Sequence, residues 1–110
     1  MNTYTIVIAP EAREHLLDLY RYIAKAASPQ IAADYTSRIL AYCESLSTAP
    51  HRGQDRGDIR PGLRIANYRK RAAIAFVVDG NQVAILGIFY GGRDHQAILG
   101  DQEGDLTDRD

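Results

Sequence analysis

The sequence predicts an α+β fold in the order β-α-α-β-β-β, with an antiparallel sheet of about four strands packed against an α-helical hairpin. Three observations support this prediction. A β-branched segment near the start precedes two amphipathic segments that are separated by almost no loop. Three apolar segments of strand length follow, and a tight turn joins the last two. At 110 residues, the chain is long enough for one domain with its own hydrophobic core.

The first half of the chain predicts one strand and two helices. Residues 3–9, TYTIVIA, are rich in the β-branched and aromatic side chains that strands favour. Pro10 suits the first turn of a helix, because the backbone N–H that proline lacks would be unpaired there anyway. Ser28-Pro29 repeats this start signal with a capping side chain, so a second helix follows almost at once. Helices joined this tightly should form an antiparallel hairpin.

Each predicted helix carries one apolar stripe, because its apolar residues recur at three- and four-residue spacing. These stripes are expected to pack against the sheet. The first stripe comprises Ala12, Leu16, Leu19, Tyr20, Ile23 and Ala27. The second stripe comprises Ile31, Ala32, Tyr35, Ile39, Tyr42, Cys43 and Leu46.

The second half of the chain predicts a loop and three strands. Residues 49–62 are dense in Gly, Pro and Asp and predict a loop, whereas residues 63–68, LRIANY, predict a strand. Two further apolar segments flank Asp79-Gly80 and predict a β-hairpin. A two-residue turn at Asp79-Gly80 or at Gly80-Asn81 would place Arg69, Arg71 and Tyr90 on one face of the sheet, because side chains alternate with period two.

The charge is unevenly distributed along the chain, although the net charge is only −1. Residues 101–110, DQEGDLTDRD, hold five acids and one base, and we expect an acidic, disordered tail after a domain of residues 1–100. From Arg52 to Arg71 there are seven basic residues and two acids. This basic stretch indicates either an anionic partner, such as nucleic acid or an acidic protein segment, or a solvated basic face.

Composition argues against several classes of protein. The chain has one cysteine, Cys43, which excludes an intramolecular disulfide and is typical of a reducing compartment. His15, His51 and His95 show no metal-ligand spacing with Cys43, so we expect no metal site, and no motif indicates a cofactor. No apolar run is long enough to span a membrane, and the first residues lack the features of a signal peptide. We therefore expect a cytoplasmic protein.

Residues 87–99, GIFYGGRDHQAIL, combine the end of an apolar strand with ionisable side chains. Cleavage of RNA through its 2′-hydroxyl needs a base, an acid and cations beside the phosphate. Arg69, Arg71 and Arg93 could supply the cations, and Tyr90 or His95 the base. A turn stabilised by an Arg93–Asp94 pair would explain the same residues without catalysis.

Three segments together resemble the RelE/ParE superfamily of toxins from bacterial type II toxin–antitoxin systems, and the ParE (plasmid stabilisation) branch in particular. They read IAPEAREHLLDLYRYIA, AADYTSRILAYCESLSTAPHRG and RPGLRIANYRKRAAIAFVVDGNQVAILGIFYGGRDHQAIL, within residues 4–99. The resemblance implies a β-α-α-β-β-β fold and a cytosolic toxin that a cognate antitoxin, ParD-like or another small protein, neutralises in a hetero-oligomer. For the ParE branch it implies inhibition of DNA gyrase.

The resemblance leaves two functions open. RelE-like relatives cut messenger RNA on the ribosome, whereas a ParE-like protein would be a gyrase-inhibiting binder and not an enzyme. The basic and tyrosine positions here match no complete catalytic set, which favours the binder. If the chain were a ribonuclease, its candidate catalytic residues would be Arg69, Arg71, Tyr90, Arg93 and His95. The predicted target- or antitoxin-binding residues are Arg64, Arg69, Arg71, Tyr90 and Arg93, with the helix tyrosines Tyr20, Tyr35 and Tyr42, which core packing would also explain.

Overall fold

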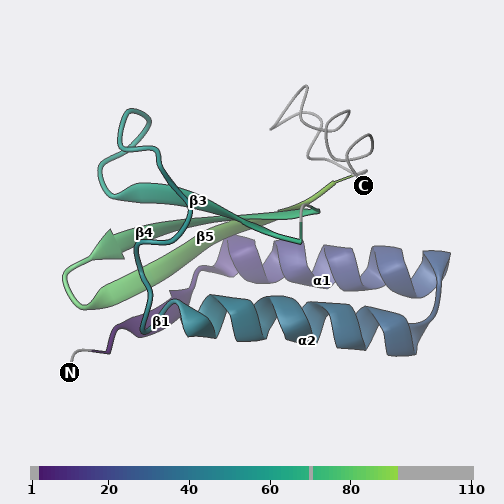
Figure 1. Ribbon diagram of the computed structural model, residues 1–110. Coiled ribbons are helices and arrows are strands. Elements are labelled where there is room, and N and C mark those ends of the chain that lie inside the picture. The colour runs from purple at the N-terminus through teal and green to yellow at the C-terminus, as the bar shows by residue number, and fades with distance from the viewer. Residues whose placement is uncertain (1–2, 70, 92–110) are drawn as a thin grey trace.

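The computed structural model describes residues 3–69 and 71–91. In this part of the chain, two antiparallel helices, α1 (Pro10–Ala26) and α2 (Pro29–Ser45), lie against one face of a five-stranded sheet (Figure 1). The strands are arranged β1-β5-β4-β3-β2 across the sheet. Their bounds are β1 Thr5–Ile8, β2 Gln54–Asp55, β3 Leu63–Tyr68, β4 Ala72–Asp79 and β5 Gln82–Tyr90. The predicted α+β class with a helical hairpin is confirmed.

The sheet differs from the prediction in two respects. β1 pairs with β5 in parallel, so the sheet is mixed and not purely antiparallel. The connection between these two strands passes through both helices and three other strands, which is long enough to return the chain to the same end of the sheet. The fifth strand, β2, lies inside the predicted loop and pairs antiparallel with β3 over only two residues.

The predicted helix starts are confirmed. Pro10 is the first residue of α1, and the Ser28 side chain accepts a hydrogen bond of 3.1 Å from the backbone N–H of Ile31 at the start of α2. Two residues of the predicted stripes are exposed, Ala27 and Ile31, the latter to 55%. Both lie at or beside the connection between α1 and α2, and Figure 1 shows that this connection projects beyond the end of the sheet.

The core lies between the helices and the helix-facing side of the sheet. Its largest fully buried side chains come from both helices and from β4 and β5, two of the interior strands of the sheet. They are Leu19, Ile39, Cys43, Leu46, Ile74, Phe76, Val83 and Ile85, of which Leu46 directly follows α2. No helix in residues 3–69 and 71–91 is long and apolar enough to cross a membrane.

The β4–β5 hairpin shows why one sequence prediction is wrong. Asp79 pairs with Gln82, so the turn consists of Gly80 and Asn81, with Gly80 at a φ of 60° that glycine adopts freely. A register shift between Ala75 and Phe76 then moves the pairing by one residue, so that Tyr90 faces Ala72. This shift changes which side chains share a face.

Arg69, Arg71 and Tyr90 therefore do not share an open face of the sheet. Tyr90 lies on the helix-facing side with Ala72 and packs against the core. Arg69 and Arg71 belong to the turn between β3 and β4, where Arg69 has a φ of 54°. The alternation of a strand does not apply in a turn, so Arg69 and Arg71 form a basic turn at the end of the sheet and not a row on one of its faces.

Candidate functional site

Five tyrosines form a continuous chain of ring contacts where the end of the sheet meets the helices. Tyr22 is on α1, Tyr35 and Tyr42 are on α2, and Tyr68 and Tyr90 end β3 and β5. Successive ring centroids are 6.3 Å (Tyr22–Tyr90), 5.6 Å (Tyr90–Tyr35), 6.2 Å (Tyr35–Tyr68) and 5.5 Å (Tyr68–Tyr42) apart. These tilted and edge-on pairs are favourable arrangements for aromatic rings.

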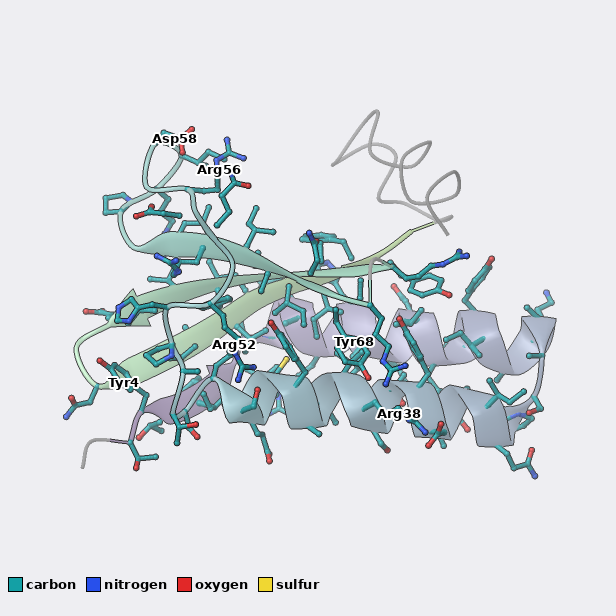
Figure 2. All side chains as sticks on the ribbon, viewed as in Figure 1. Tyr4, Arg38, Arg52, Arg56, Asp58 and Tyr68 are labelled. Carbon is teal, nitrogen blue, oxygen red and sulfur yellow. The ribbon has the colours of Figure 1, made fainter. Side chains whose placement is uncertain are left out.

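Arginines flank this chain of rings. The guanidinium of Arg69 lies 5.5 Å from the centre of the Tyr68 ring, and that of Arg52 lies 5.3 Å from the centre of the Tyr42 ring. Both distances are within the range of cation–π attraction. In Figure 2, Arg52 and Tyr68 are drawn beside α2, the helix that carries Tyr42. We call the five tyrosines with Arg52, Arg69 and Arg71 the tyrosine–arginine surface.

Tyr35 is the centre of this surface. Burial raises the pKa of Tyr35 to about 12, and the neighbouring Tyr90 and Tyr68 act in the same direction, whereas the positive charges of Arg71 and Arg69 oppose it. The Tyr35 hydroxyl is buried and has no hydrogen-bond partner among the described residues. It is therefore a neutral phenol at physiological pH, which can donate a hydrogen bond but cannot act as a base.

A second candidate surface is an apolar groove of about 300 Å³ between the two helices and the end of β1, which we call the helix groove. Apolar side chains line most of it, and Leu17 is 42% exposed there. Arg13 supplies a positive charge to its lining. Its lining residues are Ile8, Arg13, Leu16, Leu17, Tyr20, Thr36 and Leu40.

Comparison with known proteins assigns the fold to a family. Residues 6–95 match the model for the ParE toxin of the type II toxin–antitoxin system parDE. The chain belongs to the ParE toxin family. It is also 32% identical over 82 residues to Toxin ParE3 of Caulobacter vibrioides, and the match covers 74% of this chain and 81% of that protein. This ParE-like chain is thus a type II toxin, and the resemblance to the RelE/ParE superfamily is confirmed.

Solved structures share the fold of this ParE-family toxin. The chromosomal ParDE toxin–antitoxin system from P. aeruginosa matches with a TM-score of 0.69 at 21% identity, over 80% of this chain and 96% of that chain. The toxin–antitoxin complex RelBE2 from Mycobacterium tuberculosis matches with a TM-score of 0.59 at 22% identity, over 82% of this chain and 93% of that chain. At these identities, the two matches establish the shared fold.

The fold brings several of the predicted site residues of this ParE-like toxin together and separates others. Five of them join the tyrosine–arginine surface, and Tyr20 lines the helix groove instead. Arg93 and His95 lie outside the described residues, as do the rest of residues 92–100 and the acidic tail. The five residues on the tyrosine–arginine surface are Tyr35, Tyr42, Arg69, Arg71 and Tyr90.

Arg64 belongs to neither surface, although it contacts the backbone of Arg52. Its guanidinium donates hydrogen bonds to the backbone carbonyls of Arg52 (2.9 Å), His51 (2.8 Å) and Gly53 (3.2 Å). Its side chain is only 18% exposed and lies 3.9 Å from the carboxylate of Asp55. Arg64 thus holds the chain that leads into β2, and in doing so it fixes the backbone from which Arg52 reaches Tyr42.

Sequence reasoning missed Tyr22, Tyr68 and Arg52. Tyr22 lies two residues after Tyr20 on the same helix. Side chains two positions apart on a helix point to different sides, so Tyr20 fits the apolar stripe and Tyr22 does not. Tyr68 directly precedes the basic turn, which was a usable signal for an aromatic residue beside cations. Arg52 had no such signal, because its position depends on the contacts of Arg64. In the described part of the chain, no cluster of His, Cys, Asp or Glu could hold a metal ion.

Proposed function

We propose that this ParE-family toxin inhibits DNA gyrase by binding to it, and that a cognate antitoxin neutralises the toxin. Membership of the ParE family supports both parts of the proposal, and the two structural neighbours are described as toxin–antitoxin assemblies. The observation that carries the binding mode is the chemistry of the tyrosine–arginine surface. It offers exposed cations beside aromatic rings for recognition, and its central hydroxyl, that of Tyr35, is held neutral and is not suited to remove a proton.

The ribonuclease alternative requires a base whose pKa lies near neutrality. A tyrosine begins near 10, so it would need its pKa lowered by about 3 units. At the centre of the surface the shift runs the other way, because burial raises the pKa of Tyr35 to about 12. Tyr90 packs edge-on against Tyr35 at 5.6 Å and is part of the same ring cluster. These features argue against a tyrosine base and so support recognition over RNA cleavage, while the other candidate base, His95, lies outside the described residues.

The helix groove suits the antitoxin. Its lining is mostly apolar and Leu17 is exposed there, and an exposed apolar patch of this kind marks a site of interaction with a partner. A segment of the antitoxin with apolar side chains and an acidic residue near Arg13 would match this lining. The target would then bind to the tyrosine–arginine surface, which shares no residue with the lining of the helix groove.

The proposal is tested by adding purified toxin to a gyrase supercoiling assay and, in parallel, to ribosomes translating a defined messenger RNA. We expect loss of supercoiling or trapping of cleaved DNA, with the messenger intact. Codon-positioned cuts in the messenger with gyrase unaffected would establish the ribonuclease instead.

A double substitution tests whether gyrase inhibition depends on the tyrosine–arginine surface. R69Q/R71Q should reduce gyrase inhibition at least tenfold, because it removes two cations from the surface. The matched control is R56Q/R60Q, which removes two charges from the same basic stretch but from the loop before β3. Both variants should melt within a few degrees of the wild type, since a surface charge usually contributes under about 0.5 kcal/mol and a surface ion pair such as Arg56–Asp58 under about 1 kcal/mol. Equal inhibition by R69Q/R71Q and the wild type would contradict the assignment.

A further inference from the structure

The end of β5 passes directly beside the basic turn. β5 ends at Tyr90, and the backbone N–H of Gly91 donates a hydrogen bond of 2.6 Å to the carbonyl of Arg71. The chain therefore enters residues 92–110 next to Arg71 and at one edge of the tyrosine–arginine surface. Within that segment, residues 101–110 carry five acids and one base, a net charge of −4.

The surface offers charges that complement this segment. Arg69 and Arg71 are exposed in the turn, and Arg52 is exposed at the far side of the ring cluster. Arg69 and Arg52 stack on rings, which fixes their guanidinium groups without neutralising them. Four ion pairs of the described residues, Asp18–Arg21, Asp34–Arg38, Asp58–Arg56 and Asp55–Arg64, involve other arginines than Arg52 and Arg69.

We propose that residues 101–110 bind to the tyrosine–arginine surface of the same chain, with their carboxylates paired to Arg52, Arg69 and Arg71. The nine residues 92–100 can span up to about 30 Å when extended. Three ring-to-ring steps of 5.5 to 6.2 Å lead from Tyr90 to Tyr42, beside which Arg52 lies, so the whole surface is within reach. The acidic segment covers the cations until a partner with more negative charge displaces it.

The physical basis is tethering. Each exposed ion pair is weak by itself and is screened by salt. A connection of only nine residues, however, gives the attached segment an effective concentration on the order of millimolar, which makes several weak pairs sufficient. The inference goes beyond the proposed function, because it holds whether the displacing partner is gyrase, an antitoxin or a nucleic acid.

The test compares two full-length chains by amide NMR. One is the wild type and the other has a neutral segment, D101N/E103Q/D105N/D108N/D110N. We expect the amide signals of Tyr68, Arg69 and Arg71 to differ between the two chains. In the wild type these signals should move with rising salt toward their positions in the neutral variant. A synthetic peptide of residues 101–110, added to the neutral variant, should shift the same signals back, whereas its Asn/Gln counterpart should not.

A polyanion provides an independent readout that does not depend on toxicity. Single-stranded oligothymidylate should bind the neutral variant on the order of tenfold more tightly than the wild type. In the neutral variant the oligonucleotide does not have to compete with tethered carboxylates for the arginines. The substitutions lie outside the described fold, and equal melting temperatures will verify that they leave it intact.

Two results would overturn the inference. In one, differences between the two chains are confined to residues 92–110 and the signals of the basic turn do not move. In the other, the oligonucleotide binds both chains equally, so the surface receives external anions only. Neither result bears on gyrase inhibition, so the proposed function would stand or fall separately.

Discussion

The hydroxyl of Tyr35 is buried among aromatic neighbours, and this placement affects stability in a pH-dependent way. Burial raises the pKa of Tyr35 from its ordinary value of 10.0 to about 12 in the folded chain. Above pH 10 the unfolded chain loses this proton while the folded chain retains it. The contribution of Tyr35 to stability is therefore fully present below pH 10 and is lost as the pH rises toward 12.

Tyr35→Phe isolates this effect. At neutral pH the variant should be about as stable as the wild type, because the hydroxyl has no hydrogen-bond partner among the described residues to lose. Between about pH 10 and 12 its melting temperature should fall less steeply than that of the wild type. Tyr4→Phe, at the opposite end of the sheet from Tyr68 in Figure 2, serves as the control and should follow the wild type. Parallel curves for Y35F and the wild type would contradict the assignment of the pKa shift to Tyr35.

At the scale of elements, α1 completes the edge of β5 beyond the point where β1 ends. Just after β1, the backbone N–H of Ala9 donates a hydrogen bond to the carbonyl of Ile85 on β5. Further along β5, the N–H of Ile88 donates to Nδ1 of His15 at 3.1 Å. The His15 ring also lies 5.0 Å from the ring of Phe89. One histidine thus takes the place of a neighbouring strand and holds α1 against the sheet.

Removal of this side chain should be costly. His15→Ala leaves the N–H of Ile88, a residue only 4% exposed, without its acceptor, and such a loss costs about 1–3 kcal/mol. Urea unfolding measures this difference. His51→Ala is the matched control, because the His51 side chain is exposed and its carbonyl, which binds Arg64, is retained. A change below about 0.5 kcal/mol in H15A, equal to that in the control, would show that the bond contributes nothing to stability.

The elements also show which features of the fold could be predicted from the sequence. Both helices, β3 and the hairpin followed from local signals, such as Pro10, the Ser28 cap and the turn near Gly80. The shift at Ala75/Phe76 did not, because the partner strand there reads as a continuous apolar run, without polar residues to mark the two faces.

The candidate site was harder to predict for the same reason. Local patterns named Arg69, Arg71 and the helix tyrosines, but their assembly depends on tertiary contacts. The register shift between β4 and β5 places Tyr90 on the side of the sheet that faces the helices. The guanidinium of Arg64 donates its hydrogen bonds to backbone carbonyls. The parallel pairing of β1 depends on the return of β5 at the far end of the chain, and β2 has only two residues, too few for a periodicity to be seen.

At the scale of the whole molecule, the toxin presents two surfaces of different chemistry. Tyr20 lines the helix groove and Tyr22 joins the tyrosine–arginine surface, although both belong to α1. The groove is mostly apolar, whereas the other surface carries cations over aromatic rings. If each surface serves one partner, a single substitution can separate binding of the antitoxin from inhibition of the target.

Leu17→Asp tests this separation. Leu17 is 42% exposed in the helix groove, so the fold should tolerate the change, but a carboxylate there would be buried beneath a bound apolar segment. We expect the affinity for the proposed antitoxin to fall at least tenfold in a binding titration, while gyrase inhibition is retained. Ile31→Asp is the control, since Ile31 is 55% exposed at the tip of the helical hairpin and outside the groove lining. Unchanged antitoxin affinity in L17D would place the antitoxin elsewhere, and simultaneous loss of both activities with normal melting would show that the two partners share one surface.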